Sequence, residues 1–270
     1  MAKILSLKNV SIEYNEESLF LKVLSRFTKS FHKNNKAVKN VSFDLEEGKV
    51  LGIIGESGSG KSSIVKAIVG LIRPTKGEII YNGKYHIEKF NSRGEWKPIR
   101  SDIQMIFQNP SASLDPCMTV YDIIAEPVIS SNSNISKKEL DEKVFTMMKN
   151  TCLHQDFKSK YTTQCSGGQN QRIAIARALI QKPKILLCDE PVSALDLSTQ
   201  ANIMNLLIEL RSKFNLSMIF ISHDLNVVNY IADDIIVMNK GEIIESGKRE
   251  DIYTNPKHKY TKLLVDLSMY

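Results

Sequence analysis

The chain has 270 residues, of which 42% are hydrophobic and 7% aromatic, with 36 Lys and Arg against 30 Asp and Glu. This composition is typical of a globular protein of one large domain, and no apolar run approaches the roughly 18 residues that a membrane span needs. Residues 21–40 hold six basic and no acidic side chains, which leaves the rest of the chain neutral. A basic nucleic-acid-binding face spread over the fold is therefore not expected.

The N-terminus and the cysteines favour a cytosolic protein that neither spans a membrane nor is exported. Lys3 and Lys8 enclose only a four-residue stretch, ILSL, which is too short for the h-region of a signal peptide. The four cysteines form no C-x-x-C pair and lie at no zinc-binding spacing from a histidine, so we expect reduced thiols.

Short apolar runs that predict buried strands alternate with segments of helical periodicity, which is the pattern of an α/β protein with a largely parallel sheet. Four of these runs are each followed by a glycine loop or a polar side chain: Val50–Ile54 by Gly55, Ile103–Phe107 by Gln108, Ile185–Cys188 by Asp189, and Met218–Ser222 by His223. Because ligands bind beyond the carboxyl ends of parallel strands, the four runs predict one shared site.

Residues 116–165 have a different character. Tyr121, Ile124 and Val128 follow helical spacing, and Ser130–Ser136 resembles a polar linker. We therefore expect a helical subdomain inserted into an α/β core. The expected division of the single domain 1–270 is a core of residues 1–115 and 166–270 with the subdomain at 116–165. A further helix is expected at Ser198–Ser212, where an apolar stripe predicts core packing.

The strongest chemical signal is a phosphate-binding motif, G-x-x-x-x-G-K-[ST], which lies between the first apolar run and a helical segment. The residues expected to bind the nucleotide here are Gly55, Glu56, Ser57, Gly58, Ser59, Gly60, Lys61, Ser62 and Ser63. Glycines let backbone N–H groups wrap phosphates at a helix N-terminus. Lys61 would reach the β- and γ-phosphates and Ser62 would bind Mg²⁺, so the motif predicts ATP with Mg²⁺; a chance Gly/Ser-rich turn is the alternative.

Two adjacent carboxylates follow the third run. Asp189 is suited to hold Mg²⁺, and Glu190, whose side chain points the other way on a strand, would polarise a water for attack on the γ-phosphate. Alone, an acidic pair after a strand more often caps a helix. The phosphate loop in the same chain favours the catalytic interpretation.

A second helix start with an anion-binding pattern comprises Ser166, Gly167, Gly168 and Gln169. One nucleotide does not need two such loops from one subunit. We therefore expect this loop to act on the nucleotide of a second subunit; a flexible turn with a helix cap is the alternative.

In order and spacing, these motifs resemble the ATP-binding cassette (ABC) ATPases over nearly the whole chain. The resemblance implies a P-loop NTPase (RecA-like) core with N-terminal antiparallel β elements. It also implies that Gln108 is a catalytic residue and Mg²⁺ ligand, that His223 contacts the γ-phosphate, and that Ser193–Asp196 form the D-loop. Cys165 stands where the family usually has Leu at the start of the signature motif.

The same resemblance calls for an aromatic side chain stacked on adenine near the N-terminus. Tyr14 is the first choice and Phe31 the second, although an aromatic residue at that place also suits a core. Between Tyr14 and Ala37, one helical stripe is apolar and a second, running from Lys22 to Lys33, is basic. This segment predicts either a basic amphipathic helix that lies against the anionic cytoplasmic leaflet or a membrane subunit, or a solvated or partly disordered surface insertion.

A narrower resemblance links Phe107–Pro116 and Asn255–Leu264 to the ATPases of oligopeptide, dipeptide and nickel importers, with departures at Cys117 and Lys259. It implies that the protein hydrolyses ATP to drive import. The protein would bind peripherally to the cytoplasmic face of the cell membrane. The implied partners are a second, paralogous ABC ATPase subunit, two transmembrane permease subunits and, indirectly, an extracellular substrate-binding protein, with no nucleic acid. Two alternatives stay open: a soluble ABC ATPase acting on nucleic acid or ribosomes, and a catalytically silent partner.

Overall fold

The computed structural model describes residues 2–14, 35–90, 93–96 and 99–268. The expected basic helix and Phe31 lie outside these ranges. Within them, the first of two sheets is antiparallel, with strand order β2-β1-β4-β5. Its strands are β1 (Lys3–Tyr14), β2 (Asn35–Glu46), β4 (Lys76–Tyr81) and β5 (Tyr85–His86). The antiparallel elements implied by the family resemblance are therefore present.

The second sheet has six strands in the order β10-β9-β3-β8-β7-β6. They are β3 (Val50–Ile54), β6 (Ile103–Ile106), β7 (Ile185–Asp189), β8 (Ser217–Ser222), β9 (Asp234–Asn239) and β10 (Glu242–Lys248). Only the β9-β10 pair is antiparallel. The four apolar runs thus form the adjacent strands β3, β8, β7 and β6, whose carboxyl ends share one edge of the sheet, and the α/β fold is confirmed.

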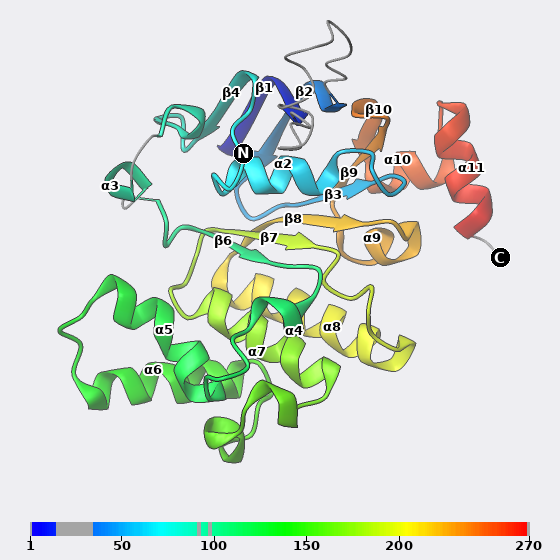
Figure 1. The fold of residues 1–270 in the computed structure, drawn as a ribbon. Helices are drawn as coiled ribbons and strands as arrows, with labels where there is room; N and C mark the ends of the chain where they lie inside the picture. The colour runs from blue at the N-terminus through cyan, green and yellow to red at the C-terminus, as the bar shows by residue number, and fades with distance from the viewer. Residues whose placement is uncertain (1, 15–34, 91–92, 97–98, 269–270) are drawn as a thin grey trace, which may run out of the picture.

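Helices cover both faces of this sheet (Figure 1). Helix α2 (Lys61–Ile68) lies between the two sheets. On the opposite face lie α4 (Pro110–Ser113), α5 (Val120–Ser131), α6 (Lys137–Asn150), α7 (Gly167–Leu179) and α8 (Leu197–Phe214). The remaining helices are α3 (Arg93–Trp96), α9 (Leu225–Ile231), α10 (Arg249–Thr254) and α11 (Lys259–Ser268), with 3-10 turns at Ile87–Lys89, Gln155–Ser159 and Thr162–Gln164.

The apolar core consists of two clusters, one on each face of the six-stranded sheet. Along β7, Leu186 and Cys188 belong to the cluster on the helical face, whereas Ile185 and Leu187 belong to the cluster around α2. Successive side chains of a strand point to opposite faces, so a strand covered on both sides must be apolar at every position. This is why the strands that carry the site read as continuous apolar runs.

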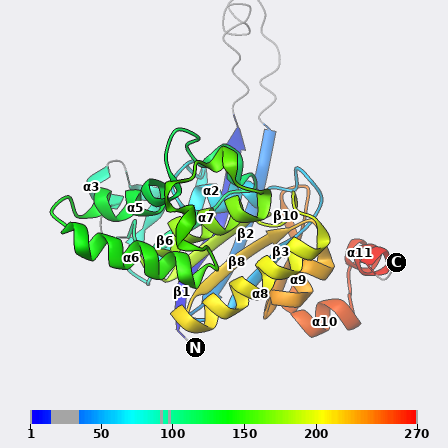
Figure 2. The same cartoon turned by 90° about the horizontal axis from the view of Figure 1, so that it is seen from below.

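Helices α5 and α6 pack on α7 and lie at the opposite end of the molecule from α10 and α11 (Figure 2). The expected helical spacing is confirmed, because Ile124 and Val128 are buried. The expected linker at Ser130–Ser136 is too long: α5 continues to Ser131, where the Ser131 hydroxyl donates to the Val128 carbonyl. The division of the chain at 116 and 165 stays a prediction.

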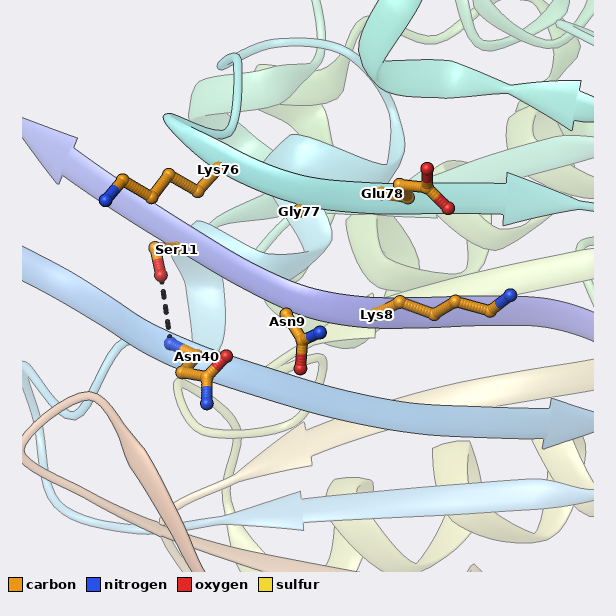
Figure 3. Close-up of a pocket in the computed structure, with 7 residues that line it drawn as sticks. All are labelled: Lys8, Asn9, Ser11, Asn40, Lys76, Gly77 and Glu78. Atoms are coloured by element: carbon orange, nitrogen blue, oxygen red, sulfur yellow. Dashed lines mark hydrogen bonds between the residues drawn. The ribbon is translucent and has the colours of Figure 1, made fainter.

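A hollow lies on the antiparallel sheet beside the irregular pairing of β1 (Figure 3). Asn9 adopts φ 51°, and a Cβ on Gly77 would overlap the Asn9 carbonyl. The backbone N–H of Asn40 donates to Ser11 Oγ at 3.0 Å. The hollow contains none of the predicted site residues.

In the described part of the chain, no helix combines the length and apolar character needed to span a bilayer.

Candidate functional site at the carboxyl edge of the parallel sheet

The phosphate loop connects β3 to α2, and steric constraints explain why it contains glycines. Gly55, Gly58 and Gly60 adopt φ angles of 153°, 80° and 100°, which disfavour other residues. A Cβ on Gly55 would overlap the Met238 carbonyl, and one on Gly60 would overlap that of Ala37. A Cβ on Gly58 would meet nothing within 4 Å. The loop is therefore packed tightly at both ends and open in the middle.

Lys61 begins α2 and is only 4% exposed. Its Nζ donates to the carbonyl oxygens of Gly55 at 2.7 Å and Glu56 at 2.9 Å. Burial lowers the pKa of Lys61, while the nearby carboxylates of Glu190 and Asp189 oppose that shift. The ammonium group thus lies directly over the loop, where it forms the positive centre of the site.

Ser62 and Asp189 come together from different elements. The Ser62 hydroxyl, on α2, donates to Oδ1 of Asp189 at 2.8 Å, and Asp189 is the last residue of β7. Burial raises the pKa of Asp189, although the Ser62 hydrogen bond works in the opposite direction. A hydroxyl and a carboxylate oxygen are hard oxygen donors of the kind that Mg²⁺ prefers.

Glu190 lies one residue beyond β7, so the expectation that strand alternation orients its side chain is wrong. It has a left-handed φ of 46°, because the chain turns after Asp189, and its N–H donates to the Ile221 carbonyl at 3.0 Å. Its Oε2 accepts from Gln108 Nε2 at 3.1 Å and lies 3.2 Å from His223 Nδ1. Side chains that follow three neighbouring strands therefore meet at one carboxylate.

Tyr14, at the end of β1, lies close to the start of α2. Its side chain is 38% exposed, and its hydroxyl lies 3.0 Å from Ser63 Oγ. The ring therefore offers an accessible apolar surface beside the loop. Its role as the adenine platform stays a prediction.

The loop also contains an orphaned polar atom. Ser59 Oγ is buried and, within the described residues, forms no hydrogen bond, although the backbone N–H of Ser59 donates to the Glu56 carbonyl at 3.1 Å. Buried polar groups are normally paired, so an unpaired one marks a place for a missing partner. An unpaired hydroxyl, an open backbone at Gly58 and a lysine over the loop together fit a phosphate group.

The second glycine loop is arranged differently. Ser166 caps α7: its Oγ accepts from the Gln169 N–H at 3.3 Å, and Gln169 Oε1 accepts from the Ser166 N–H at 2.9 Å. A Cβ on Gly168 would lie 2.6 Å from Thr199 Cγ2, and one on Gly167 would lie 3.4 Å from Leu195. Packing in its own chain thus explains why Gly168 is small. Among the described residues, no hydrogen bond joins this loop to the phosphate loop.

Tyr260 is a contact that the motifs did not reveal. The N–H of Glu56, in the phosphate loop, donates to the Tyr260 hydroxyl at 3.1 Å. The only signal in the sequence is that Tyr260 belongs to the Asn255–Leu264 segment that carries the importer resemblance.

Comparison with known proteins places this site in a family. The family model described as "ABC transporter" matches residues 38–193, more than half of the chain. The chain belongs to the ABC transporter family. It is 46% identical to the oligopeptide transport ATP-binding protein OppF of Haemophilus influenzae, over 96% of this chain and 78% of the relative. It is 47% identical to the dipeptide transport ATP-binding protein DppF of the same organism, over 85% and 69%.

Solved structures agree with the family. The chain superposes with a TM-score of 0.78 and 27% identity on cbiO1 of Clostridium perfringens, over 94% of this chain and 92% of that one. It superposes with a TM-score of 0.77 and 31% identity on a dimeric ATP-binding cassette bound to ADP and phosphate, over 91% and 98%. The ABC protein described here is thus a nucleotide-binding ATPase with the P-loop fold.

Proposed function

We propose that this ABC protein is the ATP-hydrolysing subunit of a peptide importer. The observation that carries the chemistry is the convergence of polar side chains at the sheet edge: Lys61, the Ser62–Asp189 pair and the Gln108–Glu190–His223 cluster. The peptide class rests on relatives, since the OppF proteins of H. influenzae and Escherichia coli, at 46% and 48% identity, carry oligopeptide transport in their names.

The phosphate loop would hold the β- and γ-phosphates of ATP. Lys61 already donates to two loop carbonyls and needs only to exchange them for phosphate oxygens. Mg²⁺ would be held by the oxygen atoms of Ser62, Asp189 and Gln108. Gln108 would use its amide oxygen, because its amide nitrogen donates to Glu190. Bound Mg²⁺ neutralises charge on the phosphate oxygens. Tyr14 would pack on the adenine.

Glu190 would act as the general base. Its Oε2 is held by Gln108 on one side and lies beside His223 on the other, which fixes the direction of the carboxylate. A carboxylate oriented in this way accepts a proton from a water that attacks the γ-phosphate. His223, whose side chain is 59% exposed, is free to donate toward a phosphate oxygen.

The loop Ser166–Gln169 would complete the nucleotide site of a second ABC ATPase subunit. Its glycines are exposed or half-buried, and its own capping box already satisfies the Ser166 and Gln169 N–H groups. The remaining N–H groups at the start of α7 are available to an anion. We propose a paralogous partner, so that the functional pair is a heterodimer.

Two permease subunits would carry the substrate across the membrane, supplied by an extracellular substrate-binding protein. The ABC protein would then sit peripherally on the cytoplasmic face of the cell membrane. Peptides are favoured over nickel chelates by the names of the relatives.

Reconstitution tests this function. The full chain is assembled in proteoliposomes with candidate permease subunits and a candidate paralogue, and uptake of a labelled dipeptide, a labelled tetrapeptide and a nickel chelate is measured. We expect ATP-dependent uptake of a peptide, and none with Lys61→Ala together with the equivalent change in the paralogue. ATP hydrolysis that RNA or ribosomes stimulate, without peptide uptake, would contradict the proposal.

A further inference from the structure

The phosphate loop is contacted by two side chains from different helices, Lys61 on α2 and Tyr260 on α11. Glu56 uses its carbonyl oxygen to accept from Lys61 Nζ at 2.9 Å and its N–H to donate to the Tyr260 hydroxyl at 3.1 Å. The two groups lie on successive peptide units of a loop whose residues Glu56, Ser57 and Gly58 are exposed. Tyr260 therefore contacts the loop where few other side chains hold it.

Helix α11, which carries Tyr260, is itself fixed at its start by β10. Glu245 accepts hydrogen bonds from the N–H groups of Lys257 at 2.7 Å and His258 at 2.9 Å. The N–H of Tyr260 donates to His258 Nδ1 at 3.1 Å. Burial alone would raise the pKa of Glu245, but its hydrogen bonds, including these two, outweigh burial and lower it. The carboxylate thus stays charged and anchors the segment.

The other end of α11 is tied to the element that follows His223. Asn226, on α9, donates through Nδ2 to the Ser268 carbonyl at 2.9 Å. Asp224, the residue after His223, is the N-cap of α9. Helix α11 therefore connects the phosphate loop to α9, the helix that begins just after His223.

We propose that Tyr260 is a positioning residue that pre-organises the phosphate loop for ATP. By holding the Glu56 N–H, it fixes the Gly55–Glu56 peptide, whose carbonyl oxygen belongs to Gly55 and accepts from Lys61 Nζ at 2.7 Å, so that binding need not order this part of the loop. Rigidifying a loop in its bound conformation raises affinity because less conformational entropy is lost on binding. The inference rests on the proposed function, in which ATP occupies this loop.

Phenylalanine is the informative replacement. Burial, together with the neighbouring Glu56 carboxylate, raises the pKa of Tyr260, so the hydroxyl is protonated at neutral pH. Tyr260→Phe therefore removes one neutral hydrogen-bonding group and keeps the ring. The matched control is Tyr230→Phe, which removes a hydroxyl that donates from α9 to Asn205 on α8 at 2.6 Å.

The first experiment measures binding of a fluorescent ATP analogue with Mg²⁺ to the full chain, and the melting temperature of each variant. Since one hydrogen bond contributes roughly 0.5–1.5 kcal/mol, we expect Tyr260→Phe to weaken affinity about 3- to 10-fold. In the reconstituted transporter, KM for ATP should rise while kcat changes little. Tyr230→Phe should bind like the wild type.

The second experiment tests the anchor. Glu245→Ala should weaken affinity as Tyr260→Phe does, Glu245→Gln should recover part of it because one carbonyl acceptor remains, and the double variant should lose no more than the larger single loss. Hydrogen exchange at residues 55–60 should accelerate in Tyr260→Phe.

The outcomes separate the two proposals. If the wild type binds no ATP, the proposed function fails. If the wild type binds ATP and Tyr260→Phe binds equally well, the role of Tyr260 is overturned. An affinity loss that the Tyr230→Phe control shares, or that only tracks a loss of folded protein, also overturns it.

Discussion

The two glycine loops of this ABC protein, Gly55–Ser62 and Ser166–Gln169, start similar helices but are completed in different ways. The first has a buried lysine, a carboxylate that accepts from Ser62, and polar side chains that follow β6, β7 and β8, all from its own chain. In the second, a capping box satisfies the N–H groups of Ser166 and Gln169, and the glycines lie close to Leu195 and Thr199. The difference supports the proposal that the first loop works in a site assembled within the chain, whereas the second acts on the nucleotide of a partner.

The largest expected effect lies in the first site. Glu190→Gln keeps Lys61 and the loop, so ATP binding should survive, while turnover should fall roughly 10²- to 10⁴-fold through loss of the general base. Turnover is measured in the reconstituted transporter, with the partner's own site disabled. Hydrolysis at the wild-type rate would contradict the role of Glu190.

The next effect separates the two loops. Ser166→Arg should leave ATP affinity of the isolated chain unchanged, because its own nucleotide would not touch Ser166. In the assembled pair, turnover at the partner's phosphate loop should fall on the order of 10²-fold, as when a donor to developing charge is lost. Weaker ATP binding by the isolated chain would show that the loop serves its own site.

A smaller effect tests the packing of the second loop. Gly168→Ala would place a Cβ 2.6 Å from Thr199 Cγ2 and should reduce the free energy of unfolding by about 1–3 kcal/mol. Adding Thr199→Ser removes that methyl group but keeps the hydroxyl that donates to Asp196. Denaturant unfolding should show recovery in the double variant; equal stability of Gly168→Ala and the wild type would exclude the overlap.

The smallest effect concerns the folding stability that the first site loses by burying the charge of Asp189. Since burial raises the pKa of Asp189, its ionised form destabilises the nucleotide-free fold, and this cost grows as pH rises through the folded-state pKa. Asp189→Asn should therefore raise the melting temperature without nucleotide at pH 7, with a smaller gain at acidic pH, and should weaken Mg²⁺-dependent ATP binding. A lower melting temperature at pH 7 would contradict this.

Much of the first site was predictable because its residues follow local patterns. Lys61 and Ser62 belong to one motif that follows β3, and Asp189 ends β7; both strands pair in parallel with β8, so their carboxyl ends lie at the same edge of the sheet. Two features were not predictable. The left-handed turn at Glu190 depends on where β7 stops, and the Tyr260–Glu56 contact joins residues 204 positions apart with no shared pattern.

The extent of the helical region was predictable only in part. The spacing of Ile124 and Val128 identifies α5, but its end depends on a serine side chain that bonds back to its own helix. Polar residues such as Ser131 occur in helix ends and in linkers alike, so composition does not separate the two.

The central claim, that the two loops act in different nucleotide sites of a pair, is tested most directly by placing two changes in different combinations. Lys61→Ala disables a phosphate loop, and Ser166→Arg disables a signature loop; the paralogue carries the equivalent changes. With both changes in one subunit, both sites of the pair should be inactive. With one change in each subunit, one site should stay intact and retain measurable ATP turnover. The reverse result, activity with both changes in one subunit and none when they are split, would contradict the account.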